Sequence, residues 1–124
     1  MNRPFIVSIP QLTDYAAVAK RLGHRLSAEP SNRPLDQPLV SVITVCRNAA
    51  TTLPACLASV RAQTYPWIEH LVIDGGSTDE TSALLDHSTH LGGWVSETDA
   101  GISDAFNKGL ALSRGTIIGI LNAD

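Results

Sequence analysis

The sequence has 124 residues, of which 44% are hydrophobic and 17% are charged, and its formal net charge at pH 7 is −3. This length and composition predict one globular domain with its own core and argue against a disordered chain. The small negative charge gives no basic patch for nucleic acid, and no apolar run is long enough for a membrane span. The apolar stretch before Pro10 is too short for a secretory signal. We therefore expect a cytoplasmic protein, and a position at the inner face of the membrane stays open.

Residues 1–38 differ from the rest of the chain. Thr13 is a candidate helix cap, and apolar side chains follow it at helical spacing, with basic residues on part of the other face. Such a helix could bind a membrane surface or a partner, but simple docking on the domain is the favoured interpretation. Prolines among polar residues then indicate a linker. We interpret residues 1–38 as an N-terminal extension with a linker and residues 39–124 as the domain proper.

The domain is predicted to alternate strands and helices. Short apolar runs rich in β-branched residues predict buried strands at 40–45, 68–73, 94–96 and 116–121. Apolar side chains at helical spacing predict helices between them, and Gly115 is expected to end the last helix in a left-handed conformation. This order is typical of an α/β fold with a parallel sheet and right-handed crossovers.

The second predicted strand ends at an acidic residue, Asp74, which two glycines follow where the backbone must turn. Ser77 and Glu80 have the spacing of a capping box, which predicts a helix start at Ser77. Ligands of open α/β sheets bind at the carboxyl ends of the strands. Asp74 can therefore contact a ligand or can simply cap the backbone of the turn, and this stretch alone does not decide between the two.

Polar side chains follow every predicted strand. In chain order they are Arg47 and Asn48, then Asp74, then Glu97 and Asp99, and finally Asp124. If the strands are parallel, these side chains share one edge of the sheet. Several carboxylates near one arginine suit a ligand that brings a cation, such as a nucleotide diphosphate with Mg²⁺ or Mn²⁺.

Four segments carry a family resemblance. They are VSVITVCRN at 40–48, VIDGGSTD at 72–79, SETDAGISDAFNKG at 96–109 and IGILNAD at 118–124. In this order they resemble the donor-binding half of a family 2 glycosyltransferase, over residues 39–124. The resemblance implies a GT-A domain, which is a Rossmann-like, mostly parallel sheet with flanking helices, here truncated after its fourth core strand. Such a domain binds a nucleotide-diphospho-sugar.

The resemblance also implies roles for individual residues. In such enzymes the aspartate that matches Asp74 contacts the nucleoside base, the end of the first strand lines the nucleotide pocket, and the loop from 97 to 101 lies beside the donor. Asn122-Ala123-Asp124 matches the DxD motif, with Asn122 in place of its first aspartate. The candidate nucleotide-sugar-binding residues are Thr44, Val45, Arg47, Asp74, Glu97, Asp99, Gly101, Lys108 and Asn122, and Asp124 is the candidate ligand of Mg²⁺ or Mn²⁺.

The implied reaction is the transfer of a sugar from a nucleotide-diphospho-sugar, with a UDP-sugar as first candidate, to a hydroxyl of a glycan or lipid-linked acceptor. The resemblance weakly implies a role in bacterial polysaccharide or cell-envelope synthesis. In the family the acceptor site and the catalytic base lie further along the chain. We therefore expect this chain to supply only the donor-binding half, we name no catalytic residue, and we leave open whether the chain is itself an enzyme.

Two alternatives stay open. One is a non-catalytic fragment or a degenerate module that binds a nucleotide or a partner. The other, a dinucleotide-dependent oxidoreductase, is disfavoured because the turn after the first predicted strand lacks the G-x-G-x-x-G pattern.

Overall fold

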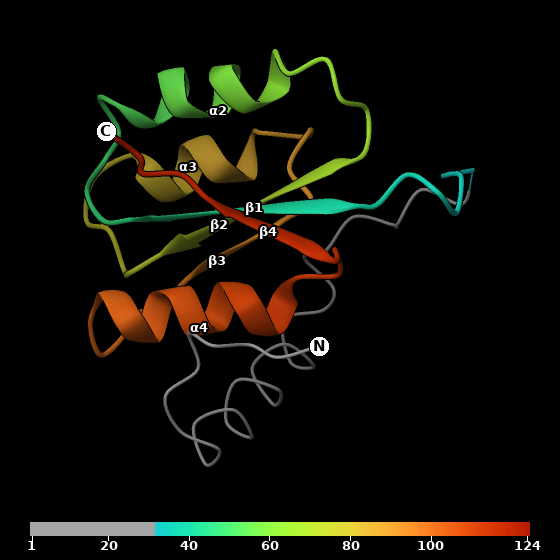
Figure 1. The fold of residues 1–124 in the computed structure, drawn as a ribbon. Helices are drawn as coiled ribbons and strands as arrows, with labels where there is room; N and C mark the ends of the chain where they lie inside the picture. The colour runs from blue at the N-terminus through green and yellow to red at the C-terminus, as the bar shows by residue number, and fades with distance from the viewer. Residues whose placement is uncertain (1–31) are drawn as a thin grey trace.

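The computed structural model describes residues 32–124, so the helix predicted after Thr13 lies outside the described residues. The elements are, in order, β1 (Val40–Cys46), α2 (Leu53–Arg61), β2 (Ile68–Asp74), α3 (Thr81–Asp86), β3 (Gly93–Ser96), α4 (Ile102–Leu112) and β4 (Ile117–Ile120). Each predicted strand is present, with ends within one residue of those expected. Figure 1 shows α2 and α3 on one face of the sheet and α4 on the other.

The sheet has the strand order β3-β2-β1-β4, and all of its pairs are parallel. This confirms the predicted α/β architecture. In the register of the sheet, Asp74 lies opposite Cys46 on one side and Ser96 on the other. The last residues of β1, β2 and β3 therefore meet at one edge, which we call the carboxyl edge.

The core has two layers because successive side chains of a strand point to opposite faces. The layer under α4 contains Ile43, Leu71, Ile73, Val95, Ala105, Leu110 and Leu112. The layer under α2 and α3 contains Leu53, Leu57, Val72, Leu85, Leu91 and Ala123. The layer under α4 thus rests on buried residues of β1, β2 and β3, and the layer under α2 and α3 rests on Val72 of β2.

The connection from α4 to β4 passes very close to β1. A Cβ atom on Gly115 would lie 2.4 Å from the carbonyl oxygen of Leu39, so this position tolerates only glycine. The prediction that Gly115 ends α4 in a left-handed conformation is wrong. The helix is capped at Ser113, whose backbone is extended, and the glycines with positive φ in residues 32–124 are Gly76 and Gly101.

A buried ion pair fixes the opposite edge of the sheet. The carboxylate of Glu69, which is 5% exposed, accepts bonds from the side chain of Arg114 at 2.9 Å and from its backbone N–H at 2.7 Å. Glu69 also accepts a bond from the hydroxyl of Ser41 at 2.5 Å, and that hydroxyl accepts one from the N–H of Gly115 at 2.8 Å. These bonds tie β1, β2 and the chain entering β4 together where the strands begin.

Candidate functional site

The loops that follow β1 and β2 are held together by Asn48. Its backbone lies in the left-handed region, with φ of 51°, which asparagine tolerates better than most residues. Its side-chain oxygen accepts bonds from the N–H groups of Thr78 at 2.8 Å and Asp79 at 3.3 Å, and its own N–H donates to the hydroxyl of Ser77 at 2.7 Å. The two loops thus form one rigid part of the carboxyl edge.

Asp74 is fully buried at the end of β2. Its carboxylate accepts bonds from the hydroxyl of Ser96 at 2.7 Å and from both the N–H, at 3.1 Å, and the hydroxyl of Ser77. The thiol of Cys46 donates a longer bond of 3.7 Å. Burial, and after it the charge of Asp74, raises the pKa of this thiol to about 12. The geometry therefore shows Asp74 holding the turn and the ends of β1, β2 and β3, while its predicted contact with a base stays a prediction.

The predicted capping box at Ser77 and Glu80 is wrong. The helix α3 begins at Thr81, and Glu80, at its N-cap position, makes no side-chain capping bond. The hydroxyl oxygen of Ser77 accepts the N–H of Asn48 at 2.7 Å, and its hydrogen is donated to Asp74, so this hydroxyl serves the loop and not the start of α3. Asp79 instead accepts bonds from the N–H of Thr81 at 3.0 Å and from its hydroxyl at 2.5 Å, and these bonds lower the pKa of Asp79.

A pocket of about 320 Å³ opens at the carboxyl edge, between the ends of β1 and β2 and the start of α4. Its lining residues are Val45, Cys46, Arg47, Gly75, Asp99, Gly101, Ile102 and Ala105. We call it the donor-edge pocket. Four of the predicted site residues, Val45, Arg47, Asp99 and Gly101, come together here. The pocket combines apolar walls with one cation and one carboxylate, which is the usual character of a small-molecule site.

The carboxylate of Asp99 lies directly over the turn that follows β2. A Cβ atom on Gly75 would lie 2.8 Å from an oxygen of Asp99, so any larger residue at 75 would displace it. The other oxygen accepts a bond of 3.0 Å from the N–H of Gly101. The φ of 121° at Gly101 strongly favours glycine. Two glycines therefore place Asp99 at the wall of the pocket.

Lys108 lies beneath the loop that precedes α4 and does not line the pocket. Its side chain is 6% exposed, and its ammonium group donates to the carbonyl of Thr98 at 3.3 Å and pairs with Glu97 at 3.4 Å and Asp104 at 3.7 Å. Asp104 also accepts a bond of 2.7 Å from the N–H of Ala100. Glu97 and Lys108, both predicted to bind the donor, are thus placed to hold the loop that carries Asp99.

The remaining predicted site residues lie elsewhere. Thr44 is buried on the α2 side of β1, with its hydroxyl 2.8 Å from Nε2 of His70. Asn122 and Asp124 line another cavity, of about 430 Å³, together with residues of α2 and the turn before it. In residues 32–124, no three side chains of His, Cys, Asp or Glu come together as a metal-binding group.

Cys46, which also lines the donor-edge pocket, falls within the strand end from 44 to 47 that the resemblance placed at the nucleotide pocket. The sequence did not lead us to name Gly75, Ile102 and Ala105, the other lining residues. Gly75 carried a usable signal, because the two glycines after Asp74 marked a backbone that another group approaches closely. Ile102 and Ala105 were predicted on one side of the last helix, but nothing in that pattern showed that this side begins at a pocket.

Comparison with known proteins decides the family. The sequence profile described as "Glycosyl transferase family 2" matches residues 41–124. The chain belongs to this family. The "PGL/p-HBAD biosynthesis glycosyltransferase" of Mycobacterium bovis (strain BCG / Pasteur 1173P2) is 41% identical over 91 residues, which cover 70% of this chain and 36% of that protein. The "O-antigen biosynthesis protein RfbC" of Myxococcus xanthus is 32% identical over 124 residues, which cover 93% of this chain and 10% of that protein.

Solved structures of GT-A glycosyltransferases resemble the fold. The mannosyltransferase PcManGT from Pyrobaculum calidifontis, solved with GDP-Man and Mn²⁺, has a TM-score of 0.64 and 28% identity, covering 93% of this chain and 35% of that one. TarS from S. aureus has a TM-score of 0.63 and 26% identity, covering 69% of this chain and 16% of that one. These matches confirm the Rossmann-like GT-A fold. This chain spans about a third or less of the length of the relatives described.

The helices were also compared with the requirements for a membrane span. None of those in residues 32–124 is both long enough and apolar enough to cross a bilayer.

Proposed function

We propose that this chain supplies the donor-binding part of a glycosyltransferase, which moves a sugar from a nucleotide-diphospho-sugar to an acceptor hydroxyl. The observation that carries the proposal is the donor-edge pocket, where Val45, Arg47 and Asp99 meet at the ends of parallel strands. Membership of glycosyl transferase family 2 and the complex of PcManGT with GDP-Man support it.

Each side of the pocket offers a different contact. The apolar side chains of Val45 and Ile102 can pack against the face of a nucleoside base. The carboxylate of Asp99 can accept a hydrogen bond from a ring N–H of the base. Arg47 is exposed at the mouth, where its guanidinium can pair with phosphate oxygens. Asp74 contributes by holding the turn, and a direct contact with the base would have to replace one of its bonds to serine.

We propose that Asp124 holds Mg²⁺ or Mn²⁺ with the donor, whose diphosphate would then extend from the donor-edge pocket to the cavity that Asn122 and Asp124 line. Asp124 is exposed after the last strand, and Asn122 can add an amide oxygen. This donor set fits, because Mg²⁺ is often bound through one or two carboxylates, with substrate phosphates and water as the other ligands. The Mn²⁺ in the PcManGT complex supports the choice of metal. A bound cation would offset the negative charge on the departing diphosphate.

Our first candidate donor is a UDP-sugar, and a GDP-sugar is the second. The names of the relatives, which concern PGL/p-HBAD and O-antigen biosynthesis, support a glycan or lipid-linked acceptor in bacterial polysaccharide or cell-envelope synthesis. We place this work in the cytoplasm or at the inner face of the membrane. The second candidate function is a nucleotide-binding module without chemistry, because the described residues supply a donor pocket and we assign no catalytic base to them.

An amide NMR titration of the chain with UDP and with GDP, each with Mg²⁺, tests the proposal. We expect saturable shifts at Val45, Arg47 and Asp99. Asp99→Asn should weaken binding by about tenfold, because a charged acceptor of a hydrogen bond is lost. Asp86→Asn, at an exposed position in α3, is the matched control and should bind like the wild type. A folded chain whose pocket amides ignore both nucleotides would overturn the proposal.

A further inference from the structure

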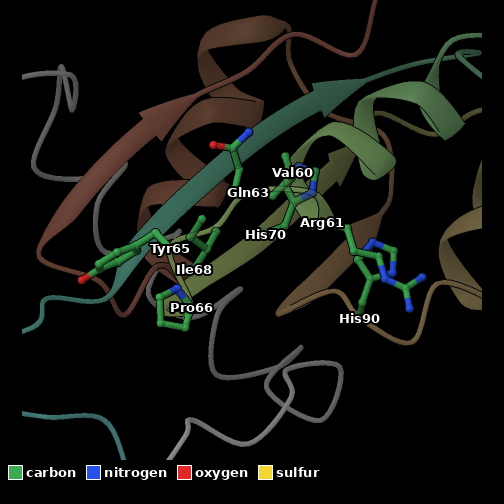
Figure 2. Close-up of a pocket in the computed structure, with 8 residues that line it drawn as sticks. All are labelled: Val60, Arg61, Gln63, Tyr65, Pro66, Ile68, His70 and His90. Carbon is green, nitrogen blue, oxygen red and sulfur yellow. The ribbon is translucent and has the colours of Figure 1, made fainter.

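A second pocket lies far from the carboxyl edge, between the last turn of α2 and the beginning of β2. Its volume is about 230 Å³, and Figure 2 shows its lining residues, Val60, Arg61, Gln63, Tyr65, Pro66, Ile68, His70 and His90. We call it the His70 pocket. It shares no residue with the donor-edge pocket, and the proposed sugar transfer does not use it.

A buried histidine in this pocket has an unused polar atom. His70 is only 2% exposed, and its Nε2 lies 2.8 Å from the hydroxyl of Thr44. Its Nδ1 is buried and has no hydrogen-bond partner among residues 32–124. Because buried polar atoms in folded proteins are nearly always hydrogen-bonded, an unpartnered ring nitrogen at the wall of a pocket points to a ligand or to bound water.

The charges of the pocket select the kind of ligand. Arg61 is always positively charged, and it forms no ion pair with a carboxylate of residues 32–124. Burial, and then the charge of Arg61, lowers the pKa of His90. Burial lowers the pKa of His70 to about 4, so His70 is neutral near pH 7 and carries one ring proton. When the hydroxyl of Thr44 donates to Nε2, that proton is on Nδ1, the buried ring atom without a partner in residues 32–124.

We propose that the His70 pocket binds a small oxyanion, that is, the phosphate or carboxylate group of a small molecule. Arg61 supplies the positive charge, His90 a second ring, and Nδ1 of His70 an N–H donor, while Val60, Tyr65 and Ile68 provide apolar walls for the body of the molecule. Binding satisfies the buried nitrogen and selects one tautomer of His70. In that tautomer the hydroxyl of Thr44 donates to His70 and not to the sulfur of Cys56, which lies 3.7 Å from it.

Long-range ¹H–¹⁵N NMR of the histidine rings tests the site directly. The chain is titrated near pH 7 with inorganic phosphate and, separately, with acetate, at constant ionic strength set with chloride. We expect saturable shifts of the rings of His70 and His90, with His70 in its Nδ1–H form. His87 is an internal control, because its Nδ1 lies 2.7 Å from the carbonyl of Ala83, outside the pocket. A response to phosphate alone or to acetate alone would identify which oxyanion the site prefers.

Matched variants separate specific binding from general attraction. Arg61→Gln should raise the Kd for the oxyanion by about tenfold or more, because it removes a charged donor. Arg47→Gln removes the same charge at the opposite edge and should leave the responses of His70 and His90 unchanged. His90→Gln offers a second route if Arg61→Gln fails to fold, and it should weaken the shift of His70. The proposal is overturned if the two rings do not respond, if their shifts never saturate, or if the two arginine variants weaken binding equally.

Discussion

The burial of Asp74 leads to a prediction that separates a structural from a ligand-binding carboxylate. Replacing Asp74 by alanine removes the acceptor for the N–H and hydroxyl of Ser77 and for the hydroxyl of Ser96. The hydroxyl groups can rotate toward other partners, but the N–H of Ser77 is fixed by the backbone. We therefore expect Asp74→Ala to destabilise the fold before any effect on a ligand is considered.

The magnitude follows from these bonds. A hydrogen bond to a charged group contributes about 1.5–3 kcal/mol, and a buried donor left without a partner costs about 1–3 kcal/mol. Since the effects overlap, we expect Asp74→Ala to lower the free energy of unfolding by about 3–5 kcal/mol. Asp74→Asn keeps one acceptor oxygen but turns an amide donor toward other donors, so its cost should be about half as large. For a domain stable by about 5–15 kcal/mol, either loss is large.

Urea unfolding followed by circular dichroism measures these losses. With a slope of about 1–3 kcal/mol per molar urea, Asp74→Ala should lower the midpoint by roughly 2 M. Asp86→Ala, an exposed carboxylate change in α3, is the control and should stay within about 0.5 kcal/mol of the wild type. Equal urea midpoints for Asp74→Ala and Asp86→Ala would refute the reasoning. They would mean that the carboxylate of Asp74 does not stabilise the fold and is available to contact a ligand.

Three further predictions concern residues of β1 and α4. Gly109→Ala should cost about 1–3 kcal/mol in urea unfolding, because its Cβ would lie 2.5 Å from Cγ2 of Ile43. Adding Ile43→Ala, which removes that Cγ2, should give a combined loss smaller than the sum of the two single losses, and additive losses would contradict this. Lys108→Met removes the cation that pairs with Glu97 and Asp104, so it should lower the free energy of unfolding by about 1–2 kcal/mol. It should also speed amide hydrogen exchange in the loop before α4, and unchanged exchange would count against the role of Lys108. Cys46 has its pKa raised to about 12, so little thiolate is present at pH 8. It should therefore react with iodoacetamide at pH 8 about a thousandfold more slowly than a free cysteine. Equal rates for native and urea-unfolded protein, measured by mass spectrometry, would exclude the raised pKa.

The alternation of strands and helices was predictable from the sequence because each element carries a local signal. The apolar run at Ile68–Asp74 is buried on both faces along nearly its whole length, as expected for a central strand of a parallel sheet. The β-branched run at Val40–Cys46 alternates between buried and partly buried residues over its first four positions. The errors occurred where a tertiary contact overrides the local pattern. Ser77 has the spacing of a helix cap, but its hydroxyl accepts the N–H of Asn48 and donates to Asp74. Gly115 follows a helix, but the close approach of the backbone of Leu39 is what requires glycine there.

The candidate site was only partly predictable for the same reason. The edge of the sheet followed from the ends of the strands, and Val45, Arg47, Asp99 and Gly101 do meet there. Which side of β1 a residue faces depends on the register, so Thr44 points to His70 while its neighbour Val45 lines the pocket. Asp104 pairs with Lys108 at the i,i+4 spacing of a helix, which the sequence shows. The other partners, Glu97 and the carbonyl of Thr98, lie in the loop before α4, and no spacing rule in the sequence reports how that loop folds back.

The two carboxylates nearest the turn after β2 have different environments, and the difference suggests how they share the work. Asp74 is fully buried and surrounded by donors from the protein, so its negative charge serves the fold. Asp99 is half-buried, held by one bond to Gly101, and lines a pocket that also contains a cation. A ligand can use an oxygen that the fold does not already occupy at little cost in stability. We therefore expect Asp74→Asn to change mainly the urea midpoint and Asp99→Asn to change mainly the nucleotide Kd, and a reversal of the two results would mean that the carboxylates have exchanged these roles.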